Sequence, residues 1–249
     1  GLTAQEMNGW LYFGGGLELW RELYEPFGII PFPVGNTGTQ MGGWFNREIN
    51  SVADLKGLKI RMPGMGGEVL TRAGATTVNL PGGEIFTALQ SGAIDATEWV
   101  GPYNDLAFGL HKAAKYYYYP GWHEPGSTIE LLVNQQAYDQ LLKDLQEIVA
   151  QATTQANLRM LSEFTARNNI ALNSLINDHG VELRPFPDAV LDELQQHARA
   201  MFTELTDRDP KSAKIYQSFS QYRDQVMQWH EISEQAILTI RKPASEQSH

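Results

Sequence analysis

Between Leu58 and Trp99 the chain alternates between short apolar runs and amphipathic segments. The runs at 58–62, 76–80 and 94–99 have the length and composition of strands, and the segments at 67–73 and 83–90 have helical spacing. Successive strands that are joined through a helix pair in parallel, because the helix returns the chain to the start of the sheet. The pattern therefore predicts an α/β fold with a mainly parallel sheet and helices on both of its faces.

The segments before and after this region extend the pattern. Thr3–Tyr24 has the spacing of a helix that is interrupted at Gly14–Gly16, and Thr3 with Glu6 forms a capping-box pattern. The glycines lack the lysine and the spacing of a phosphate loop, so we interpret them as a helix break or a close contact. The other elements expected before residue 135 are a strand at 28–34, a glycine-rich turn at 35–43, a capped short helix at 51–56, and strands at 116–119 and 129–134.

The second half of the chain is mainly helical in pattern. Apolar side chains recur at three- and four-residue spacing from Leu141 almost to Asn177, which predicts one unusually long helix. After it we expect a strand at 180–186, a helix at 188–205 and a last helix at 211–241.

Composition excludes several classes of function. The 249-residue chain has a net charge of −10, which argues against nucleic acid as the main partner, because phosphate binding needs a basic face. It has no cysteine, so disulfides, thiolate zinc sites and cysteine nucleophiles are excluded. No run approaches the ~18 apolar residues of a membrane-spanning helix. The six histidines contain no i, i+4 pair, and we interpret His123 as a hydrogen-bonded loop residue, with a place in a cleft as the alternative.

Two short motifs carry candidate chemistry. Arg61 ends a predicted strand and precedes a turn at Pro63-Gly64, and a guanidinium fixed in this way is the natural bidentate partner of a carboxylate. Glu98 and Trp99 end another predicted strand. Each motif alone has a simpler interpretation: a surface salt-bridge arginine in the first case, and a surface acid next to a core aromatic residue in the second.

The stretch Asp54–Trp99 as a whole resembles the core signature of the solute-binding proteins of tripartite ATP-independent periplasmic (TRAP) transporters, the DctP-type family. It reads DLKGLKIRMPGMGGEVLTRAGATTVNLPGGEIFTALQSGAIDATEW. The resemblance implies a periplasmic-binding-protein-like architecture, in which two α/β lobes close on a ligand and one long helix forms a spine across both. It also implies a periplasmic location and the TRAP membrane subunits as partners. Family members have further sequence before the point that matches Gly1, so we expect a partial chain that lacks part of the first lobe.

The same resemblance implies a division of the chain. We expect residues 1–35 to be the remnant of the first lobe and residues 36–126 to belong to the second lobe. Residues 127–165 would supply a first-lobe strand and the long spine helix, and residues 166–249 would complete the second lobe and the C-terminal helices. The lobes then interleave along the chain.

Within the family, the sequence is most similar to the branch that binds 2-oxo and 2-hydroxy monocarboxylates through a metal ion. In those receptors a glutamine, an acidic side chain and the backbone carbonyl of the next tryptophan hold the cation, and an arginine binds the ligand carboxylate. The matching positions are Gln40 in GNTGTQMGGWF, Arg61 in IRMPG, Glu98 and Trp99 in ATEWVGP, and Glu124 in PGWHEPG. The resemblance implies Gln40, Glu98 and Trp99 as metal ligands, and Arg61, Gln40, Glu124 and Trp99 as substrate-binding residues.

The implied cation is Na⁺ or Ca²⁺, because hard cations prefer such oxygen ligands. Glu98 and a monocarboxylate contribute two negative charges, and Arg61 with a monovalent cation contributes two positive charges. This count mildly favours sodium and leaves calcium open.

These features predict a receptor without catalytic activity that binds a small pyruvate- or lactate-like acid. The alternative is a metal-assisted enzyme that acts on oxo acids at the same cleft, which would need a general acid or base beside the reacting carbon. The sequence shows no nucleophile–base pair for that role. A receptor of an ATP-driven importer is a third interpretation, and it gives no reason for the spacing of Gln40 and Arg61.

The last predicted helix, 211–241, has apolar residues spaced for one face: Ile215, Tyr222, Trp229 and Ile237. The simpler interpretation is a helix that packs on its own lobe. The branch that the chain resembles includes receptors that exchange a long C-terminal helix between subunits, which implies a possible homodimer.

Overall fold

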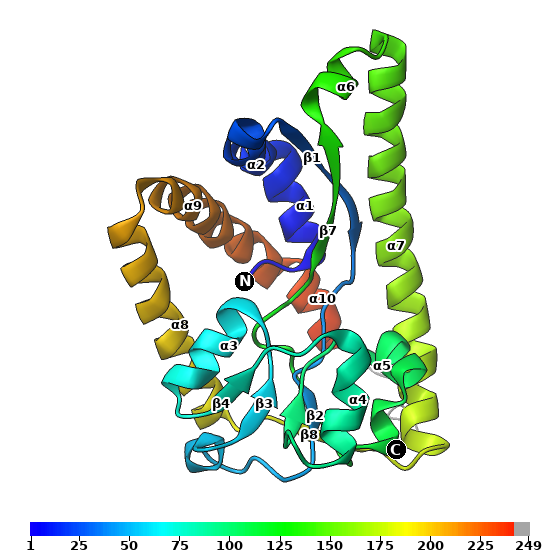
Figure 1. Ribbon diagram of the computed structural model, residues 1–249, viewed down its shortest axis with the longest axis vertical. Helices are drawn as coiled ribbons and strands as arrows, with labels where there is room; N and C mark the ends of the chain where they lie inside the picture. The colour runs from blue at the N-terminus through cyan, green and yellow to red at the C-terminus, as the bar shows by residue number, and fades with distance from the viewer. Residues whose placement is uncertain (242–249) are drawn as a thin grey trace.

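The structure is a computed structural model that describes residues 1–241, and one long helix, α7, runs along its whole length (Figure 1). The strands are β1 Ile29–Asn36, β2 Gly43–Phe45, β3 Lys59–Arg61, β4 Thr76–Val78, β5 Ala96–Thr97, β6 Tyr116–Tyr119, β7 Thr128–Asn134 and β8 Glu182–Pro185. The helices are α1 Ala4–Phe13, α2 Gly16–Tyr24, α3 Gly64–Arg72, α4 Gly82–Gln90, α5 Pro102–Phe108, α6 Gln135–Asp139, α7 Lys143–Asn177, α8 Asp188–Arg208, α9 Pro210–Ile232 and α10 Glu234–Ile240, with 3-10 helices η1 Glu25–Phe27, η2 Val52–Leu55 and η3 Leu110–Lys112. Among the described helices, none is long and apolar enough to span a bilayer.

Six strands form the larger sheet, in the order β4-β3-β5-β2-β6-β8. β3 pairs in parallel with β4 and β5, and β6 pairs in parallel with β8. β2 lies between β5 and β6 and is antiparallel to both, so the other five strands share one direction. The predicted α/β class and the mainly parallel sheet are confirmed. The strand β2 corrects the prediction, in which its first residue, Gly43, was the end of a turn.

Adjacent residues of the central strands point to opposite faces of this sheet. Trp44 and Tyr117 belong to a buried cluster that includes residues of α4 and α7, whereas Phe45 and Tyr118 belong to a cluster with α3 and α8. This is the two-residue side-chain period of a strand. Because both faces are covered, the sheet is the middle layer of a closed α/β core.

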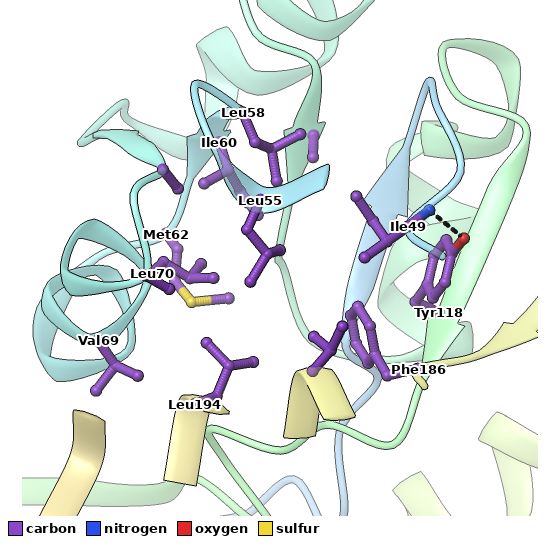
Figure 2. Close-up of a cluster of buried hydrophobic side chains, with 14 of the residues drawn as sticks. Ile49, Leu55, Leu58, Ile60, Met62, Val69, Leu70, Tyr118, Phe186 and Leu194 are labelled. Atoms are coloured by element: carbon purple, nitrogen blue, oxygen red, sulfur yellow. Dashed lines mark hydrogen bonds between the residues drawn. The ribbon is translucent and has the colours of Figure 1, made fainter. Parts of the chain in front are cut away.

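Figure 2 shows the cluster on the α3 and α8 side. Leu194 of α8 lies opposite Val69 and Leu70 of α3, and all three side chains are at most 3% exposed. The backbone amide of Ile49 donates a 2.7 Å hydrogen bond to the Tyr118 hydroxyl at the edge of the cluster. The buried tyrosine is therefore satisfied, as a polar group in a core must be.

The long helix α7 connects this core to the other end of the molecule. Its 35 residues correspond to roughly 50 Å at 1.5 Å per residue, and it ends at Asn177, as predicted from the apolar spacing. It packs against α5 near the larger sheet and against β1 farther along. It thus has the span that the predicted spine helix requires.

A two-stranded antiparallel sheet of β1 and β7 lies beside the other half of α7 (Figure 1). The register runs from Ile29 opposite Asn134 to Asn36 opposite Thr128, with an irregularity next to Gly35. A Cβ atom at Gly35 would lie 2.3 Å from the sulfur of Met160 on α7. Glycine thus lets the Met160 side chain pack directly on the strand backbone, and a larger residue here would displace that side chain.

The C-terminal helix differs from the prediction. Instead of one helix over 211–241, α9 ends at Ile232 and α10 begins at Glu234. Ser233 between them has a non-helical backbone, and its hydroxyl donates a 2.7 Å hydrogen bond to the Trp229 carbonyl. Serine side chains that bond the backbone in this way compete with the helix, which explains the break.

The expected division into lobes stays a prediction. Of its last part, 166–249, the residues 242–249 lie outside the described range, and so does His249.

Candidate functional site

The predicted site residues lie along the edge of the larger sheet that is formed by the ends of its strands. Arg61 ends β3 and Glu98 follows β5, and because these strands are parallel neighbours, the two residues leave the sheet at the same edge. β2 runs the opposite way, so Gln40, shortly before β2, also lies at this edge. The loop after β6 brings Glu124 there as well. Ligands of α/β sheets bind at the carboxyl ends of the strands, which is this edge.

Arg61 and Glu98 form a buried ion pair. Arg61 Nη1 lies 3.3 Å from Glu98 Oε2 and donates a 3.0 Å hydrogen bond to the Glu98 carbonyl. Its Nε donates to the Leu80 carbonyl at 3.3 Å. Both side chains are about nine-tenths buried. Burial lowers the pKa of the Arg61 guanidinium, and the Glu98 carboxylate acts in the opposite direction.

One face and one nitrogen of this guanidinium have further roles. The Arg61 carbon Cζ lies 5.4 Å from the centre of the Trp99 ring, a cation–π distance, and Trp99 in turn packs on Phe108. Within residues 1–241, Nη2 of Arg61 donates no hydrogen bond. The arginine is therefore fixed by its neighbours while one of its donors is left for a ligand.

The Gln40 side chain is held so that its amide oxygen is free. Thr37 Oγ1 donates to the Gly38 carbonyl at 3.0 Å, so it must accept the 3.1 Å bond from Gln40, which identifies the nitrogen, Nε2, as the group facing it. Gln40 Oε1 is then buried without a hydrogen-bond partner in the described part of the chain. A buried amide oxygen that accepts no hydrogen bond is suited to bind a cation.

The backbone around Gln40 ties three loops together. Its amide donates to the Glu124 carbonyl at 3.4 Å, and its carbonyl accepts from the Gly121 amide at 3.1 Å. The next amide, of Met41, donates to the Val100 carbonyl at 3.1 Å. Gln40, the Glu98-Trp99 segment and the Glu124 loop are thus neighbours. No hydrogen bond reaches the Trp99 carbonyl from any described residue, so this oxygen also fits the role of a cation ligand.

Glu98 also belongs to a second group of potential metal ligands. One atom each of Glu98, His123 and Glu124 lie within 4.8 Å of one another. Glu98 Oε1 is 3.7 Å from His123 Nε2, and Glu124 Oε1 accepts a 2.5 Å hydrogen bond from the Ser127 hydroxyl. Both ring nitrogens of His123 are buried and lack a partner among residues 1–241. The interpretation of His123 as a hydrogen-bonded loop residue is therefore wrong: its ring lies beside Glu98 and Glu124, and its place in a cleft stays a prediction.

Sequence reasoning missed Asp105, a buried residue that holds the chain next to the site in place. Asp105 is buried and accepts hydrogen bonds from Trp44 Nε1 at 2.9 Å, the Tyr117 hydroxyl at 2.7 Å and the Val100 amide at 3.2 Å. It therefore anchors the chain directly after Trp99. Burial raises the pKa of the Asp105 carboxyl to about 6. An acid in an apolar helical segment was the available signal in the sequence.

Comparison with known proteins gives a consistent result. Residues 2–209 match the DctP family, described as bacterial extracellular solute-binding protein, family 7. A monocarboxylate 2-oxoacid-binding periplasmic protein of Nostoc sp. is 47% identical over 234 residues, which are 94% of this chain and 64% of the relative. The chain thus spans less than two thirds of that relative's length.

Three solved TRAP solute-binding proteins share the fold closely. The protein of Colwellia psychrerythraea, with bound calcium and pyruvate, has a TM-score of 0.93 and 47% identity over 96% of this chain and 73% of its own. That of Pseudoalteromonas atlantica, with sodium and pyruvate, has 0.93 and 45% over 97% and 74%. That of Bordetella bronchiseptica, a mixed-occupancy dimer with calcium and picolinate, has 0.92 and 39% over 96% and 71%. The chain belongs to the DctP family of bacterial extracellular solute-binding proteins.

Proposed function

We propose that the protein is the periplasmic solute receptor of a TRAP transporter and binds a small 2-oxo or 2-hydroxy monocarboxylate, such as pyruvate or lactate, together with a cation. It would deliver the solute to the membrane subunits of the transporter. The observation that carries the proposal is the orphan amide oxygen of Gln40 in the loop beside the Arg61–Glu98 pair. The relatives with bound pyruvate and a calcium or sodium ion support the same chemistry.

Each residue has a distinct role in this proposal. Arg61 binds the solute carboxylate through Nη2 and a second donor that it shares with its present partners. Gln40 Oε1, a Glu98 carboxylate oxygen and the Trp99 carbonyl bind the cation, and the solute oxygens complete its coordination. The Trp99 ring keeps the guanidinium in place through their 5.4 Å contact. Glu124 lies next to Glu98, so the bound solute and cation must accommodate a second negative charge beside them.

The position of Glu124 changes the charge count. With Glu98 alone, the site with a monocarboxylate balances Arg61 and a monovalent cation. Glu124 lies in the same 4.8 Å group, which makes three negative charges, counting the solute. Arg61 and a divalent cation supply three positive charges. The count therefore favours calcium for this chain over the sodium that the sequence mildly favoured, and both ions occur in relatives.

The enzyme alternative has less support. The family is one of solute-binding proteins, and Glu98, the acid that would serve catalysis, is already paired with Arg61. Dicarboxylates are also disfavoured, since Arg61 is the single basic side chain of the proposed set. We therefore propose binding without turnover.

A homodimer through the C-terminal helices is a further part of the proposal. On α9, Ile215 and Tyr222 pack with Trp10 of α1, so that half of the helix packs on its own chain. Trp229 and Ile237, predicted on the same face, are 60% and 58% exposed. An exposed apolar surface of this kind favours a partner. Light scattering checks it: a monomeric mass that is unchanged on truncation after Pro210 would contradict the dimer.

Isothermal titration calorimetry tests the binding function. We expect pyruvate and lactate to bind in the presence of calcium or sodium, and the heat to disappear after chelation in a sodium-free buffer. Succinate serves as the control ligand, and tighter binding of succinate than of pyruvate would contradict the monocarboxylate assignment. Following pyruvate consumption in the same samples separates a receptor from an enzyme.

A further inference from the structure

His123 occupies an unusual position for a loop histidine. Its side chain is 7% exposed, and neither ring nitrogen has a hydrogen-bond partner within the described chain. Nε2 faces Glu98 Oε1 at 3.7 Å, which is too long for a hydrogen bond. A buried polar ring without a partner is destabilising unless another group completes its interactions. The ring therefore points into the site with an unused nitrogen.

The 3.7 Å gap has the size of a metal-bridged pair. Zinc bonds of ~2.0–2.2 Å to nitrogen and carboxylate oxygen place two ligand atoms ~3.4 Å apart at a tetrahedral angle and slightly farther apart at wider angles. Glu124 contributes a third ligand atom, and all three lie within 4.8 Å of one another. One nitrogen and two carboxylates thus lie close enough for small side-chain movements to bring them around one ion.

Both carboxylates are oriented by hydrogen bonds from outside the group. Arg61 binds Glu98 Oε2, so Glu98 Oε1 faces His123. Ser127 binds Glu124 Oε1, and the second oxygen of Glu124 has no donor among residues 1–241. Partners of this kind fix the direction of metal ligands and are a usual feature of built metal sites.

We infer that Glu98, His123 and Glu124 form a binding site for a divalent transition-metal cation of the zinc type. An imidazole nitrogen suits zinc and its neighbours in the transition series, whereas calcium and sodium prefer oxygen alone. The inference builds on the proposed function because the oxygen set of Gln40, Glu98 and the Trp99 carbonyl shares Glu98 with this site. Zinc and calcium therefore compete for Glu98. With zinc bound, Glu98 and Glu124 contribute two negative charges, and Arg61 and the ion contribute three positive charges, so a bound monocarboxylate would complete the balance.

Calorimetry with the whole chain tests this site. After treatment with a chelator, ZnCl₂ and CaCl₂ are titrated separately and the ratio of the two affinities is determined. We expect His123→Ala and His123→Gln to lower the zinc-to-calcium ratio at least tenfold, because both variants remove the nitrogen ligand. The Gln variant keeps most of the side-chain volume, so it separates loss of a ligand from loss of packing.

The matched control is His111→Ala. His111 packs against His179 at a ring distance of 4.2 Å beside a different cavity, so it tests whether zinc binds to that histidine pair instead. The ratio should stay at the parental value in this control. Co²⁺ gives a second readout, since visible absorption of a nitrogen-containing site should appear in the parent and in His111→Ala and be lost in both His123 variants.

Two results would overturn the inference: an unchanged ratio in both His123 variants, or a fall in His111→Ala alone. Pyruvate binding with calcium is measured on the same samples. If zinc binding depends on His123 but the parent binds no pyruvate with either calcium or sodium, the proposed function fails and the zinc site stands. If pyruvate and calcium bind but zinc ignores His123, the zinc site fails and the proposed function stands.

Discussion

The strands β6 and β7 are both short and apolar, yet they lie in contrasting surroundings. In β6, inside the larger sheet, Tyr117 and Tyr118 are at most 1% exposed. In β7, which pairs with β1 alone, Leu131 and Leu132 are 38% and 45% exposed. A strand-like sequence thus predicts pairing, but the layers that cover the strand come from elsewhere in the fold. The candidate site is attached to the covered sheet, where its residues are held by a complete core.

The long helix α7 shows the same contrast in side-chain burial between its two parts. Near the larger sheet, Leu175 is fully buried in the cluster around Trp44 and Tyr117. Farther towards the β1–β7 end, Leu158 is 66% exposed. The two leucines are chemically identical and lie in one helix, so they offer a direct way to compare the two regions.

The largest expected effect is on stability at Leu175. Leu175→Ala should lower the free energy of unfolding by about 2–5 kcal/mol, because it leaves a cavity in a packed core. Leu158→Ala should change it by less than about 0.5 kcal/mol, since the side chain is mostly in solvent. Urea unfolding of both variants measures the difference. Equal losses would mean that the two ends of α7 are packed to the same degree, which would break the comparison.

Asp105 makes the sheet region respond to pH. Its ordinary carboxyl pKa of 3.8 rises to about 6 on burial, so the folded state binds the proton more tightly than the unfolded state does. The stabilisation from this protonation is complete below pH 3.8 and is lost as the pH rises to about 6, with a total of about 3 kcal/mol at ~1.4 kcal/mol per pH unit.

Asp105→Asn should remove this pH dependence. The difference in unfolding free energy between parent and variant should therefore change by about 2.5 kcal/mol between pH 4 and pH 7, most of the total. Glu130→Gln, on the exposed strand β7, is the control for a carboxylate-to-amide change in the other region. A constant difference for Asp105→Asn would show that this carboxyl does not titrate in the window.

Arg61→Lys tests the site at the edge of the sheet. The charge is kept, but an ammonium does not present the paired donors of a guanidinium. We expect solute affinity to fall by about 1.5–3 kcal/mol, which corresponds to a loss of roughly 10- to 150-fold. Arg167→Lys on α7 is the control, because Arg167 pairs with Glu163 on the surface. Near-parental affinity in Arg61→Lys would place Arg61 outside the site.

Gln40 and Glu98 should act as one unit. Gln40→Ala and Glu98→Ala should each abolish the dependence of solute binding on the cation, and the double variant should be little worse than either one. Residues that share one metal give coupling energies of about 0.5–3 kcal/mol. Calorimetry with and without calcium measures the double-mutant cycle, and fully additive losses would remove the shared cation.

The sequence predicts those parts of the molecule that depend on local patterns. The length of α7 follows from apolar spacing, and the capping boxes at Thr3 and Ser51 follow from the residue three positions later. Arg61 and Glu98 could be expected to meet because parallel strands end at one edge of a sheet. For the same reason the α/β class could be predicted from the helix–strand alternation.

Other features depend on contacts between distant segments and have no local pattern. β2 has only three residues and exists because β5 and β6 flank it on both sides. His123 is buried because its loop folds against Gly66, whose added Cβ would lie 3.3 Å from the His123 Cβ. Asp105 was missed because its partners Trp44 and Tyr117 come from two other strands.

The smallest expected effect compares the two capping boxes. Ser51 with Asp54 caps η2 beside the larger sheet, and Thr3 with Glu6 caps α1 in the other region. Loss of an N-cap costs about 1 kcal/mol in each helix. Since η2 belongs to the closed core, Ser51→Ala should lower the global unfolding free energy by about this amount. Thr3→Ala should affect it less than half as much and should instead speed hydrogen exchange of α1 amides, because α1 can open locally. Equal global losses and unchanged exchange in α1 would show that both regions unfold as one cooperative unit.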